Sequence, residues 1–333
     1  MTKQNIDILF KKILKEYQIY APVLANKELF VKKALNIKEI DYSGRIPLNS
    51  WKQLFLPDCE TLFTYTGNFK KEKANYPKVC AGNMTILDLR ALGLYDLVFS
   101  EDPYYQQRRQ NILVVGFSFG APNEENFADW KVFSMKLEEN ILEHVPFDIF
   151  LEKDKKGNFK IYSGSIKGQE LLEKYKIKEY KNIKFAGLIP EEGPDKRMLE
   201  LGKSIKKSAN HPLWDELDKI CFACGKCSLV CPTCFCFDTE DVPDKDSVKR
   251  QRLWGNCFYP EFTAIAGGKN YTDTVKKKIK FWYDHKFSRI PAEFKVPGCV
   301  SCNRCTLVCP VGIDIIKNLN RLNSKVTKKS AKK

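Results

Sequence analysis

The sequence has no cysteine between Cys80 and Cys221, and eleven of its thirteen cysteines lie between residues 221 and 309. It also has no apolar run of transmembrane length, since the longest nearly apolar stretch covers only residues 112–121. The first residues, MTKQNIDILFKKILKEY, are charged and amphipathic, which is unlike an export signal. Clustered thiols without an export signal predict a soluble protein of the reducing cytoplasm, in which cysteines bind metal rather than form disulfides.

The sequence does not favour either of two common enzyme classes, the serine hydrolases and the nicotinamide-dependent dehydrogenases. A G-x-S-x-G sequence at residues 116–120 contains Ser118, but Ala-Pro-Asn follows it, which predicts a turn and not the helix found after a hydrolase nucleophile. Only three histidines, His144, His211 and His285, could serve as its base. No G-x-G-x-x-G motif is present, so we do not expect the chain itself to bind a nicotinamide nucleotide.

The net charge of +15 raises the alternative of a basic nucleic-acid-binding protein. The lysines, however, are scattered along the chain, and six basic residues fall in the tail 321–333. No aromatic RNA-binding signature or helix-turn-helix spacing accompanies them. Solubility and docking to an acidic partner are therefore the preferred interpretation, with no nucleic acid and no membrane as partners.

The cysteine pattern C-x2-C-x2-C-x3-C-P occurs twice, at residues 221–232 and 299–310. It is the ligand run of bacterial two-cluster ferredoxins, in which the fourth cysteine binds the other cluster. Crosswise ligation predicts two [4Fe–4S] clusters with four thiolates each. The first set is Cys221, Cys224, Cys227 and Cys309, and the second is Cys299, Cys302, Cys305 and Cys231.

Zinc is the alternative for these cysteines, but structural zinc sites usually pair two ligands from one short loop with two from another. Here a third and a fourth cysteine follow closely in both copies, which favours clusters. Cys234, Cys236 and Cys257 belong to neither set. They could ligate a further centre, tune a cluster through contacts with it, or serve only the structure.

Hydrophobic periodicity predicts an α+β protein. Helices are expected at residues 5–17, 83–94 and after Ser165, and strands at 111–117 and 158–162. We read residues 45–63 as loops with a short helix. These elements predict an N-terminal α/β domain over residues 1–200, followed by an α-helical ferredoxin-like domain with two clusters over 201–322 and a basic disordered tail over 323–333. The long insert between the two cysteine loops contains helix-like stretches, notably at residues 272–287.

Several stretches together resemble the iron–sulfur beta subunit of cytoplasmic [NiFe] hydrogenases of the sulfhydrogenase type, and equally its close relative, the iron–sulfur subunit of anaerobic sulfite reductases. The resemblance is tight over residues 211–318 and loose over 17–172. It is carried by the stretches HPLWDELDKICFACGKCSLVCPTCFCFDTED, RQRLWGNCFYPEF, AIAGGKN, DHKF and PGCVSCNRCTLVCPVGI.

The resemblance implies a non-catalytic redox subunit that relays electrons between a flavin/NAD(P)-binding reductase subunit and catalytic subunits, of a hydrogenase or alternatively of a sulfite reductase. Many relatives carry further cysteines in the N-terminal region, which suggests a further cluster there. This chain lacks them: Leu87 stands where relatives have a cysteine before the DLRAL-like stretch. The family's Ala-Gly-Gly-His sequence ends in Lys269 here.

Overall fold

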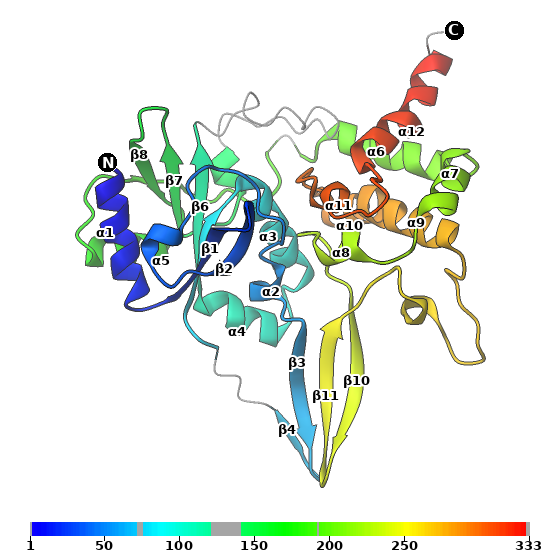
Figure 1. Ribbon diagram of the computed structural model, residues 1–333, viewed down its shortest axis with the longest axis horizontal. Coiled ribbons are helices and arrows are strands. Elements are labelled where there is room, and N and C mark those ends of the chain that lie inside the picture. Colours follow the sequence, from blue (N-terminus) through cyan, green and yellow to red (C-terminus); the bar gives the residue numbers. More distant parts are fainter. Residues whose placement is uncertain (1, 72–75, 121–140, 192, 331–333) are drawn as a thin grey trace.

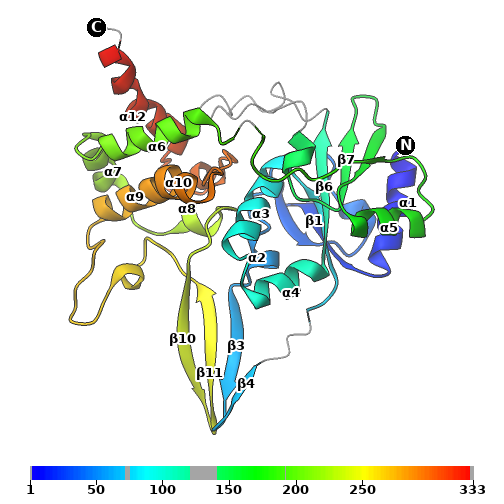
Figure 2. The ribbon, with the colours of Figure 1, turned by 180° about the vertical axis from the view of Figure 1, so that it is seen from behind.

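The computed structural model describes residues 2–71, 76–120, 141–191 and 193–330, and it shows a mixed helix-and-sheet protein, as the sequence predicted (Figure 1). A sheet with its helices occupies one side of the molecule, and a helical region that holds the clustered cysteines occupies the other (Figures 1 and 2). Within the described ranges, no helix combines the length and the apolar character needed to span a bilayer.

The sheet has seven strands in the order β2-β1-β5-β6-β7-β8-β9. Its centre, from β1 through β5 and β6 to β7, is parallel. β2 pairs antiparallel with β1 and β8 with β7, whereas β9 pairs parallel with β8. The strands are β1 (Gln18–Ala25), β2 (Glu28–Lys33), β5 (Val79–Met84), β6 (Ile112–Phe119), β7 (Ile149–Lys153), β8 (Phe159–Ser163) and β9 (Lys181–Asn182).

Helices cover both faces of this sheet. One face packs against α1 (Lys3–Leu14) and α5 (Ile166–Lys174), and the other against α2 (Lys52–Phe55), α3 (Ile86–Val98) and α4 (Pro103–Asn111). Because β5 and β6 are covered on both sides, they are almost continuously buried instead of alternating between apolar and polar residues. The predicted helices at 5–17 and 83–94 and the predicted cap at Ser165 are confirmed with small shifts of their ends.

Ser118 of the G-x-S-x-G sequence lies within β6, and its hydroxyl donates to the carbonyl of Gly120 at 2.9 Å. A hydrolase nucleophile would instead sit on a sharp turn after the strand, with its hydroxyl exposed. The predicted turn at residues 121–123 lies outside the described residues. The described geometry of Ser118 is therefore that of a buried strand residue.

A second, antiparallel sheet projects from the molecule as an arm, in the order β10-β11-β3-β4 (Figure 1). Strand β3 (Cys59–Tyr65) pairs with β4 (Phe69–Lys71) and with β11 (Ser247–Trp254), so segments about 190 residues apart in sequence lie side by side. One prediction was wrong here, since residues 59–63 belong to a strand and not to a loop. The insert opens with the hairpin of β10 (Phe237–Asp244) and β11, and the helix predicted at residues 272–287 is confirmed further on.

The cysteine region, defined as residues 196–330, is otherwise built of helices around two irregular loops. Helix α6 crosses residue 200, where the sequence predicted a domain boundary, and that division remains a prediction. Helix α12 continues to Ser330, although the sequence predicted a disordered tail from residue 323. The helices are α6 (Lys196–Lys207), α7 (Leu213–Ile220), α8 (Lys226–Leu229), α9 (Val275–Asp284), a π-helical turn (His285–Arg289), α10 (Ile290–Phe294), α11 (Arg304–Leu307) and α12 (Ile315–Ser330).

A buried ion pair joins the cysteine region to the sheet. The guanidinium of Arg304, which is fully buried, donates to both carboxylate oxygens of Asp88 at 2.7 and 3.1 Å. Its Nε donates to the carbonyl of Pro47 at 2.7 Å, and the hydroxyl of Thr85 donates to Asp88 at 2.8 Å. Every partner is thus in place, which is what a buried charge pair requires.

We expect Asp88→Ala to lower the free energy of unfolding by about 3–5 kcal/mol, because it leaves the Arg304 charge buried without its partner. The matched control is Glu216→Ala, which removes the exposed pair between Glu216 and Arg321 and should cost at most about 1 kcal/mol. Anaerobic denaturant titration followed by circular dichroism measures both. Equal losses in the two variants would show that the Asp88 pair does not hold the regions together.

Candidate metal centre

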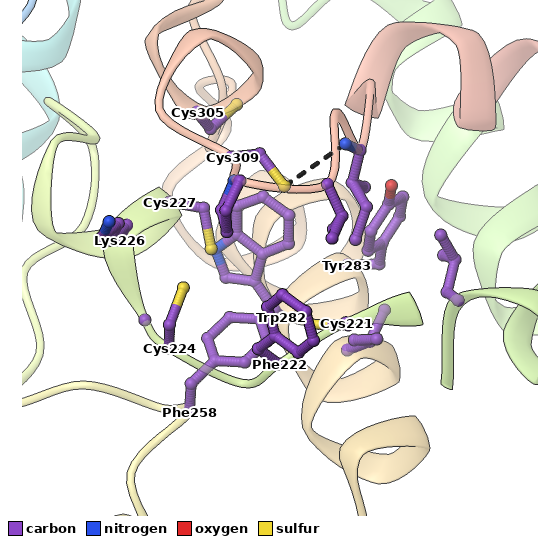
Figure 3. Close-up of a pocket in the computed structure, with 16 residues that line it drawn as sticks. Cys221, Phe222, Cys224, Lys226, Cys227, Phe258, Trp282, Tyr283, Cys305 and Cys309 are labelled. Carbon is purple, nitrogen blue, oxygen red and sulfur yellow. Dashed lines mark hydrogen bonds between the residues drawn. The ribbon is translucent and has the colours of Figure 1, made fainter. Parts of the chain in front are cut away.

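Five of the predicted ligand cysteines line one pocket (Figure 3). Cys221, Cys224, Cys227 and Cys309 are the complete first set, and the fifth is Cys305 of the second set. Cys221 directly follows α7, and Cys227 lies in α8, whose start is turned by the left-handed backbone of Gly225. The fourth comes from the distant second loop, so the structure brings together the four cysteines that crosswise ligation requires.

The rest of this pocket is apolar. Trp282 and Tyr283 of α9 and Phe258 form its wall, and Cys305 of the second set lies at its edge (Figure 3). Two backbone amides point at cysteine sulfurs: Ala223 donates to Cys221 Sγ at 3.4 Å, and Ile313 to Cys309 Sγ at 3.3 Å.

The indole Nε1 of Trp282 is buried and has no hydrogen-bond partner in the described structure. An unpaired buried donor is costly unless a ligand satisfies it. The pocket thus combines apolar walls, the thiols of the first set, two amides that donate to sulfur and an unpaired indole N–H. This combination fits an iron–sulfur cluster, whose sulfurs accept such hydrogen bonds.

The second set gathers around the ammonium of Lys286, in the π-helical turn. Lys286 is 2% exposed and donates to Cys231 Sγ at 3.1 Å, to the Thr233 hydroxyl at 2.8 Å and to the Gly298 carbonyl at 3.1 Å. Gly298 directly precedes the second cysteine loop, and a Cβ there would lie 2.3 Å from the carbonyl oxygen of Lys286. Lys286 therefore fastens the first loop to the second.

The charges of these groups are coupled. Burial by itself would lower the pKa of Lys286, but the thiols of Cys231, Cys234 and Cys299 outweigh it and hold the pKa well above its usual range. A hydrogen bond with Cys234, together with the Lys286 charge, lowers the pKa of Cys231 well below its usual range in spite of burial. A cationic lysine against a cysteine sulfur favours the thiolate, which is the form that binds metal.

The other three cysteines of the second set come from the second loop. Cys302 is buried and packs into the core beneath the sheet, whereas Cys299 and Cys305 are half-buried. Burial raises the pKa of Cys299 to about 12 although Lys286 acts against it, and Cys231 lies close enough to influence Cys299, Cys302 and Cys305 alike. Two buried hydroxyls beside them, Ser301 and Thr306, also lack partners in the described structure.

No three Cys, His, Asp or Glu side chains among the described residues stand close enough together to hold a single metal ion. A tetrahedral zinc ion would need all four sulfurs about 2.3 Å from one centre. In an iron–sulfur cluster, by contrast, each cysteine sulfur binds a different iron atom.

Lys286, Thr233 and Trp282 are parts of the site that the sequence did not predict. Lys286 lies in the stretch DHKF, which contributed to the resemblance, but no spacing rule connects a lysine at residue 286 with a cysteine at 231. Its contacts exist only because α9 ends in a π-helical turn, a distortion often found at functional sites.

The comparisons with known proteins agree with this geometry. A family described as a 4Fe-4S dicluster domain matches residues 220–313, which include both cysteine loops. The chain thus contains an iron–sulfur domain of the dicluster class, and binding of [4Fe–4S] clusters is supported.

The resemblance to a hydrogenase subunit is likewise confirmed. The chain is 25% identical, over 94% of its length and 94% of the relative's, to the sulfhydrogenase 2 subunit beta of Pyrococcus furiosus, and is a homologue of that protein. No solved structure matches the chain significantly.

We expect Lys286→Met to lower the reduction potential of a centre bound through Cys231, because reduction adds negative charge beside the missing cation. The shift should be on the order of 100 mV, the effect of a unit charge about 7 Å away at an effective dielectric of about 20. Lys278→Met is the control, since Lys278 is also a buried lysine but lies in α9 and donates to the carbonyl of Phe258. Redox titration followed by electron paramagnetic resonance measures both; equal shifts would contradict a specific role for Lys286.

Proposed function

We propose that this protein is the electron-transfer iron–sulfur subunit of a cytoplasmic [NiFe] hydrogenase complex of the sulfhydrogenase type. It relays electrons between a flavin/NAD(P)-binding reductase subunit and the catalytic subunits, and catalyses no reaction alone. The observation that carries this proposal is the convergence of two C-x2-C-x2-C-x3-C-P loops on a shared core around Lys286. The homologous sulfhydrogenase beta subunit supports the hydrogenase over the sulfite reductase alternative.

Two [4Fe–4S] clusters are held crosswise in this proposal. Cys221, Cys224, Cys227 and Cys309 bind the first, and Cys299, Cys302, Cys305 and Cys231 bind the second. When bound, such clusters store and release single electrons at potentials that hydrogen bonds and exposure adjust. The protein's own part is to exclude water with Trp282, Tyr283 and Phe258, to donate amide hydrogen bonds to the cysteine sulfurs, and to hold the Lys286 charge beside Cys231.

The first set lies nearer to the surface than the second. Cys224 is exposed, and Phe222, which lines the same pocket, is 72% exposed. The exposed Lys226 lies on the wall of the same pocket, and no ion pair involves it among the described residues. An apolar patch with basic neighbours beside a redox centre suits docking of an acidic partner protein.

Each ligand set can be tested separately. Cys302→Ser should remove about four iron atoms per chain and leave the spectrum of the first cluster, and Cys224→Ser should remove about four and leave that of the second. Anaerobic iron and sulfide analysis with electron paramagnetic resonance measures this, and circular dichroism establishes that each variant is folded. Folded variants that each lose all their iron would contradict two separate sets.

The docking face can be tested kinetically. Phe222→Asp should slow electron exchange with the flavoprotein partner about tenfold, which corresponds to ~1.4 kcal/mol of lost binding, and leave the iron content unchanged. Ile166→Asp is the control, since Ile166 is 78% exposed but begins α5 on the sheet side of the molecule. Stopped-flow absorbance at several partner concentrations measures the rates. An unaffected Phe222→Asp variant would place the docking face elsewhere.

A further inference from the structure

Three cysteines outside the two ligand sets line a pocket of their own. Cys234, Cys236 and Cys257 line one small pocket together with the imidazole of His285. They come from separate segments: Cys234 and Cys236 follow the first cysteine loop, Cys257 follows β11, and His285 opens the π-helical turn. Because these segments are far apart in sequence, only the fold brings them to one pocket.

The base of the β10–β11 hairpin brings these thiols together. Phe237 pairs with Trp254 as the last pair of the ladder, and the amide of Gly255 donates to the carbonyl of Cys236 at 2.9 Å. Cys236 and Cys257 therefore stand just beyond the paired ends. The hydroxyl of Tyr95, on the sheet side, donates to the carbonyl of Cys234 at 3.2 Å.

His285 is held in place by aromatic neighbours. Its ring packs edge-on against Phe235, with 5.7 Å between the ring centres, and lies tilted against Phe281, with 5.8 Å between the ring centres. Both neighbours are hydrocarbon rings, so they restrict the imidazole without offering it a hydrogen-bond acceptor. A positioned imidazole and three thiols make a set of soft donors, which select zinc or iron–sulfur centres.

A buried lysine lies near the same thiols. Lys52 is 2% exposed, and its ammonium nitrogen lies 4.1 Å from the centre of the Trp254 ring. Burial lowers the pKa of Lys52, and the thiols of Cys234, Cys231 and Cys236 oppose that effect.

We propose that Cys234, Cys236 and Cys257, together with His285, hold a third iron–sulfur centre between the two cysteine loops and the arm. A single zinc ion is disfavoured because these donors, like those of the two cysteine loops, are spread too widely among the described residues for one ion. The centre has Trp282 in common with the first pocket and Lys286 in common with the second set.

The test is iron, sulfide and zinc analysis of the full chain, purified anaerobically. We expect two to four iron atoms beyond the roughly eight of two cubes. The double variant Cys236→Ser/Cys257→Ser should lose only this excess iron, together with one component of the electron paramagnetic resonance spectrum. Cys234 is left intact because its thiol also forms a hydrogen bond with Cys231. Cys59→Ser, which changes an exposed thiol on β3, is the control and should lose none.

Each result decides the matter. About eight iron atoms in the wild-type chain, or an equimolar zinc ion that the double variant loses, would overturn the third centre while leaving the two-cluster proposal intact. A double variant with unchanged iron would overturn the ligand assignment. If the variant does not fold, the wild-type iron count and the number of spins in the reduced protein still decide, because two cubes cannot account for more than about eight iron atoms.

Discussion

The contact on which the rest depends is the buried ammonium of Lys286 against the sulfur of Cys231. The Nζ atom of Lys286 lies 3.1 Å from Cys231 Sγ in the first cysteine loop. It lies equally close to the carbonyl oxygen of Gly298, the residue before the second loop. A buried lysine is stable only with compensating negative charge, and thiolates provide it here. The same interaction therefore joins the two loops and holds a cysteine in the form that binds iron.

The remaining architecture supports that contact from outside. Helix α9 carries Trp282 and Tyr283 to the wall of the first pocket and then ends in the π-helical turn that directs Lys286 inward. On the other side, the pair of Arg304 with Asp88 fastens the second loop to helix α3. The sheet thus acts as a rigid frame for the loops, which have little regular structure of their own.

The proposed function is consistent with a difference in solvent exposure between the two sets of cysteines. Cys224 is exposed beside a patch that includes Phe222, whereas Cys302 is buried against the core beneath the sheet. A relay protein needs one redox centre that a partner can approach and others shielded from water. The homologous sulfhydrogenase subunit and the dicluster domain place these features in a hydrogenase-type complex in our proposal. The third thiol pocket would extend the relay toward the arm.

The sequence by itself determined the chemistry, because the spacing of cysteines within a loop is local and specifies a ligand run directly. It also predicted helices such as α1 and α3 and strand β6, whose apolar patterns are strong. It did not predict the arm, since β10 is almost wholly exposed and has no apolar pattern. These segments become strands only because β10 pairs with β11 and β11 with the distant β3. Lys286, Lys52 and the Cys257 pocket were likewise decided by tertiary structure, because their partners are far away in sequence and only the fold sets their distances.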